Sequence, residues 1–126
     1  MLDASGPVLV VDDYSTMTRI VASLLRSCGF TNVEQVHDGE SALAKLKEKP
    51  FALMISDLEM EGMSGIELLG RIKSDPMLRA VRVIMMSANP ASPQVKEALS
   101  GGASAYLVKP FSAAALQEKI DLLFGK

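Results

Sequence analysis

The sequence predicts an α/β fold in which a parallel β-sheet is covered on both faces by helices. Five short segments typical of strands alternate with five segments of helical periodicity, and the central one, residues 52–56, carries no charge. A charge-free run of this length is typical of a strand buried on both faces. Parallel strands need crossover connections, which the helices supply. The expected strands are residues 8–11, 33–36, 52–56, 81–86 and 105–108.

Each interval between expected strands carries a helical pattern. The clearest helix spans Ser15–Cys28 and stops at Gly29. Asp38 is expected to cap the next helix, which closes before Pro50. Further helices are expected over residues 65–75 and 93–100, and from a Ser112 cap onward. The residues expected to face inward are Met17, Ile20, Val21, Leu24, Leu25, Cys28, Ala42, Leu43, Leu46, Ile66, Leu69, Ile72, Val95, Ala98, Leu99, Leu116, Ile120, Leu123 and Phe124.

The composition and net charge of the chain limit the kinds of function that it can have. The 126 residues, 48% hydrophobic and 22% charged, suit one ordinary globular domain, residues 1–126, with no linker or repeat. A net charge of −2 argues against broad electrostatic binding to nucleic acid or anionic membranes. The single cysteine, Cys28, excludes an internal disulfide and is expected to be buried. No leader or membrane span is evident, so we expect a cytoplasmic protein.

Polar residues follow four of the five expected strands. Asp12 and Asp13 follow the first strand, Asp57 the third, Ser87 the fourth and Lys109 the fifth. Because the carboxyl ends of parallel strands share one edge, where ligands bind in open α/β sheets, these side chains should meet. Three neighbouring carboxylates repel one another unless a cation neutralises them, and an all-oxygen ligand set suits Mg²⁺. The positive charge of the Lys109 ammonium would also offset the negative charge that develops when a phosphoryl group approaches a carboxylate nucleophile.

The motifs VLVVDD, SDLEMEGMSG, MSA (86–88) and AYLVKPF (105–111) resemble the receiver domains of two-component response regulators, closest to the CheY-like, chemotaxis-type single-domain receivers. The resemblance covers nearly the whole chain, from Val8 to Phe124. It implies a flavodoxin-like (βα)5 three-layer sandwich with strand order 2-1-3-4-5.

The resemblance also implies roles for the residues at the carboxyl edge. Asp57 would accept a phosphoryl group from a histidine kinase, while Asp12, Asp13, Asp57 and the backbone carbonyl of Glu59 would bind Mg²⁺. Ser87 and Lys109 would contact the phosphoryl oxygens. The bond between Lys109 and Pro110 would be cis. The protein would then catalyse only its own phosphorylation and dephosphorylation, and would not be an enzyme toward other substrates.

The output of such a receiver is phosphorylation-dependent protein binding. Tyr106 matches the aromatic switch residue of the family, and Tyr106, Val108 and Lys119 match positions that contact the flagellar motor switch protein. A phosphatase is a further candidate partner, and we expect a monomer that binds neither nucleic acid nor membranes. Tyrosines in strands also serve packing alone, so that interpretation of Tyr106 stays open.

Two residues depart from the pattern of the family. Glu61 stands four residues after Asp57, where many receivers have proline, and Glu59 adds an acid beside the expected metal. Glu59 and Asn89 occupy positions that set the dephosphorylation rate in the family, so the lifetime of the phosphorylated state stays open. We assign no role to the lone His37.

Three alternative functions remain open. A phosphorelay intermediate or phosphate sink would use the same chemistry without a motor target. A small aspartyl-phosphate phosphatase needs a second acid two residues after its nucleophile, and Tyr14 stands there if Asp12 is that nucleophile. A flavodoxin-type cofactor carrier needs a phosphate-binding loop after the first strand, where this chain has DDYST.

Overall fold

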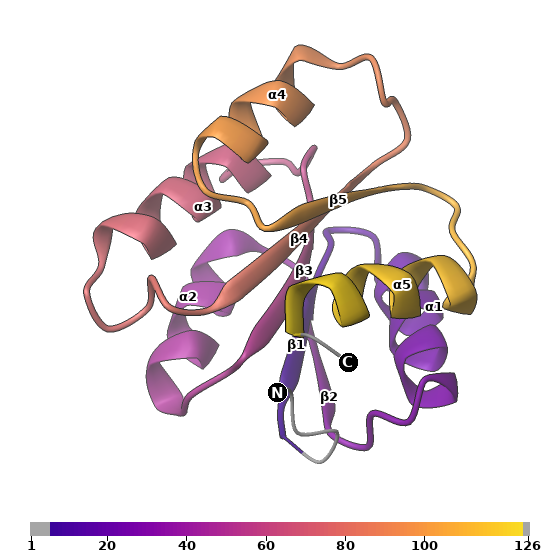
Figure 1. The fold of residues 1–126 in the computed structure, drawn as a ribbon. Coiled ribbons are helices and arrows are strands. Elements are labelled where there is room, and N and C mark those ends of the chain that lie inside the picture. Colours follow the sequence, from indigo (N-terminus) through magenta and orange to yellow (C-terminus); the bar gives the residue numbers. More distant parts are fainter. Residues whose placement is uncertain (1–5, 125–126) are drawn as a thin grey trace.

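The computed structural model describes residues 6–124, which form a five-stranded parallel sheet in the order β2-β1-β3-β4-β5 (Figure 1). This confirms the predicted fold class and strand order. In chain order the elements are β1 (Val8–Val11), α1 (Ser15–Ser27), β2 (Val33–Val36), α2 (Gly39–Glu48), β3 (Leu53–Asp57), α3 (Gly65–Ser74), β4 (Arg82–Ser87), α4 (Pro93–Ser100), β5 (Ala105–Val108) and α5 (Ala113–Phe124). Within residues 6–124, no helix has both the length and the apolar content needed to cross a bilayer.

Two apolar clusters lie on opposite faces of the sheet and produce three layers. Helices α1 and α5 cover one face, and α2, α3 and α4 cover the other (Figure 1). Alternate residues of β1 explain the division, since Val8 and Val10 join the first cluster and Leu9 and Val11 the second. All four are fully buried. Strands covered on both faces need apolar side chains at every position, which is why the central runs carry no charge.

Two of the expected inward-facing residues are exposed. Ile20 is 48% exposed and Leu99 is 46% exposed. In α1 the buried stripe is Thr18, Val21, Ala22 and Leu25, which follows helical spacing from a threonine that hydropathy alone would place outside. Leu99 lies one residue beyond the buried Ala98 in α4 and so points away from the buried side of that helix.

Three smaller differences concern residue placement. Ile66 is only half-buried in α3, and Ala52 is exposed and precedes β3. Cys28 is also only partly buried, because it follows α1 as its C-cap residue. Its thiol contacts the carbonyl oxygen of Ala113 at 3.5 Å.

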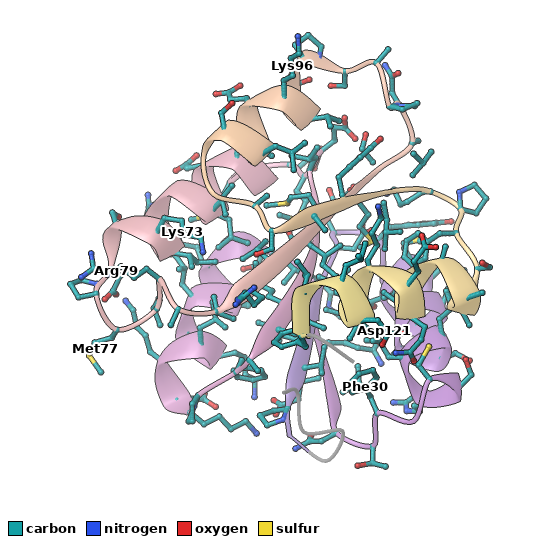
Figure 2. The ribbon with its side chains drawn as sticks, in the orientation of Figure 1. Phe30, Lys73, Met77, Arg79, Lys96 and Asp121 are labelled. Carbon is teal, nitrogen blue, oxygen red and sulfur yellow. The ribbon has the colours of Figure 1, made fainter. Side chains whose placement is uncertain are left out.

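Lys73 links the end of α3 to the connection that leads into β4. The Lys73 ammonium donates to the carbonyl oxygens of Arg79 (3.1 Å) and Val81 (3.2 Å), and Figure 2 shows Lys73 on the helix above the loop that carries Arg79. Burial lowers the pKa of Lys73. These bonds position the start of β4, and therefore the strand that ends at Ser87.

The β3–α3 loop returns tightly onto the end of β3. Ser64 caps α3 by accepting from the Glu67 amide, and the Gly65 amide donates to the Leu58 carbonyl oxygen at 2.9 Å. A Cβ atom at Gly65 would lie 2.5 Å from the carbonyl oxygen of Asp57. Only glycine lets the helix begin this close to the candidate phosphoacceptor.

Gly65→Ala should therefore lower the free energy of unfolding by about 1–3 kcal/mol, because the clash is with backbone atoms that cannot rotate away. Gly70→Ala is the matched control, since that position lies inside the same helix with open space around it. It should stabilise by up to about 1 kcal/mol. Urea denaturation measures both variants, and equal effects would contradict the steric argument.

Candidate functional site

The carboxyl edge of the sheet brings together an ion pair from two strand ends. Asp57 is the last residue of β3 and is 4% exposed. The Lys109 ammonium, just after β5, donates to Asp57 Oδ1 at 2.9 Å and lies 3.6 Å from Asp12 Oδ2. The peptide bond between Lys109 and Pro110 is cis, the isomer that the resemblance implies. Residues more than 50 positions apart thus meet in one contact.

Asp12, Asp13 and Asp57 form a compact carboxylate cluster. One oxygen from each lies within 4.8 Å of the others. Asp12 Oδ1 accepts from the Tyr14 amide at 3.0 Å, but the buried Oδ2 accepts no hydrogen bond from any residue in the described range 6–124. Asp13 is exposed and accepts from the Glu61 amide at 3.1 Å.

This cluster fits a hard divalent cation. An unsatisfied buried carboxylate oxygen beside two further carboxylates is a costly arrangement that a cation would relieve. Mg²⁺ accepts one or two carboxylates and fills its remaining positions with water and phosphate oxygens. The expected role of the Glu59 carbonyl as a further ligand stays a prediction.

Burial controls the protonation of the site. Desolvation raises the pKa of Asp57 to about 6, with the charges of Asp12 and Glu59 acting in the same direction and Lys109 opposing them. Burial likewise raises the pKa of Asp12. Burial opposes the charge on Lys109, but its contacts with Asp57 and Asp12 outweigh this and raise its pKa. The lysine therefore stays a cation beside carboxylates that are expensive to ionise.

Ser87 faces a neighbour that sequence reasoning missed. It is fully buried at the end of β4, and its hydroxyl lies 3.3 Å from each carboxylate oxygen of Glu59. The Asn89 amide donates to the same hydroxyl oxygen at 3.1 Å. The sequence marked Glu59, Ser87 and Asn89 separately, but the contact joins a loop to a strand 28 residues away and depends on tertiary structure.

Tyr106 lies on β5 near this pair. Its side chain is half-buried, and its hydroxyl oxygen is buried without a hydrogen-bond partner among residues 6–124. Burial raises the pKa of Tyr106, and the charge of Glu59 adds to this effect. Val108, in the same strand, is 41% exposed, whereas Lys119 in α5 is half-buried. Their roles in partner binding stay predictions.

Comparisons with known proteins agree with this geometry. Residues 8–121 match the profile of the response regulator receiver domain. The chain belongs to this family. Among curated relatives of this receiver, chemotaxis protein CheY-3 of Vibrio cholerae is 44% identical over the whole chain and 97% of its own length. Chemotaxis protein CheY of Pseudomonas aeruginosa is 43% identical, covering 94% of this chain and 96% of the relative.

Solved receiver structures share the fold. Chemotaxis response regulator CheY4 of Vibrio cholerae superposes with a TM-score of 0.85 at 28% identity, covering 95% of this chain and 99% of that one. The receiver domain of a Pseudomonas aeruginosa sensor histidine kinase gives a TM-score of 0.87 at 25% identity, covering 97% and 99%. That structure has a magnesium ion coordinated in its active-site cleft.

The pKa of Asp57 predicts how stability depends on pH. An acid with a raised folded-state pKa binds its proton more tightly when folded, so metal-free protein should lose stability as pH rises from about 4, the unfolded value, through about 6. Asp57→Asn mimics the neutral acid. In chelator it should raise the free energy of unfolding by about 2 kcal/mol at pH 7 and change it little at pH 4.

Urea denaturation at both pH values measures this effect. Glu97→Gln, on the exposed surface of α4, is the control for loss of one negative charge. An equal gain at pH 4 and pH 7 for Asp57→Asn would show that ionisation of Asp57 is not the cause.

Proposed function

We propose that this receiver is a response regulator phosphorylated on Asp57 by a histidine kinase, with Mg²⁺, and that phosphorylation controls its binding to another protein. The observation that carries the proposal is a buried Asp57 held by Lys109, beside a buried Asp12 oxygen that accepts no hydrogen bond among residues 6–124 and has only the same ammonium, at 3.6 Å, as an ion-pair partner. A structural carboxylate would have its oxygens satisfied within the fold. Membership of the receiver family implies a histidine kinase and a phosphorylation-dependent target.

The reaction is a transfer between two side chains. An Asp57 carboxylate oxygen attacks the phosphorus of a kinase phosphohistidine, a P–O bond forms, and the P–N bond breaks as the imidazole leaves. Lys109 stabilises the ionised nucleophile and then pairs with a phosphoryl oxygen. Asp12, Asp13, Asp57 and the Glu59 carbonyl would hold Mg²⁺, which neutralises the developing oxygen charge when bound. The chain thus catalyses only its own phosphorylation, with the phosphohistidine as the phosphoryl donor.

The switch follows from the added charge. A phosphoryl group brings about −1.5 to −2 charges and three acceptor oxygens, which attract the Ser87 hydroxyl. Tyr106 already has its hydroxyl buried, without a hydrogen-bond partner among residues 6–124, so movement of Ser87 and its loop would change the surroundings of an inward-facing ring. Tyr106, Val108 and Lys119 would then present the altered surface. Two relatives are named as chemotaxis proteins, which supports a role in chemotaxis. The flagellar motor switch as target and the cytoplasm as location follow from the resemblance to chemotaxis-type receivers.

Incubation with acetyl phosphate and Mg²⁺ should add one phosphoryl group to the natural chain, as measured by intact mass. Asp57→Asn and a chelated sample should each show no gain, because the first lacks the nucleophile and the second the cation. Incorporation into Asp57→Asn would move the phosphoacceptor elsewhere. No incorporation into the natural chain from acetyl phosphate or from a phosphorylated histidine kinase would overturn the proposal.

A peptide from the flagellar motor switch protein should bind the phosphorylated chain at least about tenfold more tightly than the unphosphorylated chain, the usual scale of allosteric coupling. Isothermal titration with and without beryllofluoride, a phosphoryl mimic, measures the difference. Equal affinities would reject the motor target and favour a phosphorelay intermediate or phosphate sink.

A further inference from the structure

We propose that the Glu59 carboxylate is an internal competitor for the Ser87 hydroxyl and holds the unphosphorylated receiver in its inactive state. The proposal rests on the proposed function and adds a regulatory contact to it. To bind the Ser87 hydroxyl as a hydrogen-bond donor, the phosphoryl group must displace the Glu59 carboxylate from it. Glu59 therefore weakens phosphorylation-dependent activation through its side chain, separately from any role of its backbone carbonyl.

The hydrogen-bonding capacity of Ser87 creates the competition. The Glu59 carboxylate and the Asn89 amide both contact the Ser87 hydroxyl, at 3.3 Å and 3.1 Å. The backbone N–H of Asn89 can only donate, so it occupies the oxygen of the Ser87 hydroxyl. The single proton of that hydroxyl is therefore left to point at the Glu59 carboxylate. Ser87 is fully buried, so its hydroxyl is not in contact with bulk solvent. One proton cannot serve two anions at once.

The sheet places the second anion next to the first. Asp57 is the register partner of Met86, the residue before Ser87, on the adjacent strand. Asp57 and Ser87 therefore lie at the same edge of the sheet, and the family resemblance implies that the Ser87 hydroxyl contacts a phosphoryl group on Asp57. That phosphoryl group would also repel Glu59, whose negative charge already contributes to raising the pKa of Asp57. Phosphorylation must therefore break the Glu59–Ser87 hydrogen bond. The free energy of that bond reduces the free energy by which phosphorylation favours the active state.

Open space lies beside the Glu59 side chain. Its side chain is exposed and lines an open cavity of about 620 Å³, together with Glu61, Ser64 and Glu97. On release it can enter solvent without disturbing the core. Tyr106 lies within reach of the same charge, because Glu59 contributes to raising its pKa. One side chain thus acts on the phosphoacceptor, the hydroxyl and the switch tyrosine.

A double-mutant cycle tests the competition. The dissociation constant for beryllofluoride in saturating Mg²⁺ is measured by ¹⁵N NMR titration for the natural chain, Glu59→Ala, Ser87→Ala and the double variant. Glu59→Ala should tighten binding about tenfold, the scale of a hydrogen bond to a charged group. In the Ser87→Ala background the same change should tighten binding clearly less, because it then removes only the repulsion by the Glu59 charge and no hydrogen bond to Ser87.

Glu97→Ala is the matched control, because its carboxylate lines the same cavity but makes no hydrogen bond or ion pair among the described residues. It should leave the dissociation constant unchanged. An equal gain from Glu59→Ala in both backgrounds would show that charge repulsion alone acts and would overturn the competition. No gain in the natural background would overturn it as well.

A measurement without ligand separates this inference from the proposed function. Glu59→Ala should shift the amide resonance of Asn89, which is 30 positions away in sequence but bonded to the same hydroxyl, and Glu97→Ala should not. An unshifted Asn89 would overturn the contact even if Asp57 is phosphorylated. Failure of the natural chain to bind beryllofluoride would instead overturn the proposed function, and the competition with it.

Discussion

The contact between Asp57 and Lys109 is the interaction on which the rest of the site depends. Two buried carboxylates at neighbouring strand ends are expensive to ionise, as the raised pKa values of Asp57 and Asp12 show. One ammonium compensates for only part of their charge. The site therefore keeps negative charge that Lys109 does not compensate. A divalent cation bound beside a phosphoryl acceptor would neutralise this charge.

The same strand ends connect the chemistry to the switch. Parallel pairing sets Asp57 opposite Met86, so Ser87 lies one residue further along the adjacent strand, at the same edge of the sheet. In the unphosphorylated chain the serine is engaged by Glu59, an acid on a loop that Gly65 folds tightly against β3. On activation in this arrangement, the phosphoryl group replaces the Glu59 carboxylate as the acceptor of the hydrogen bond from the Ser87 hydroxyl, and it is the stronger acceptor of the two.

Much of the fold could be predicted because it depends on local pattern. Short apolar runs identified most of the strands, although β2 contains Glu34 and β4 begins at Arg82, and the acids and lysine at the strand ends identified the edge that would carry a site. Helical spacing found α1 and α4 but misplaced Ile20 and Leu99. Which face of a helix is buried depends on where the sheet lies, and the sheet selected Thr18 in place of a larger apolar residue.

By itself, the sequence determined the elements, their parallel arrangement and the gathering of Asp12, Asp57 and Lys109, because the period of hydrophobicity and the polarity of strand ends are local properties of the chain. Only the tertiary structure decided the partners of those side chains. The unsatisfied oxygen of Asp12, the clash that reserves residue 65 for glycine and the bond from Ser87 to Glu59 all depend on distances of a few ångströms between segments far apart in sequence. No spacing of residue types specifies such distances, since they result from how the whole core packs.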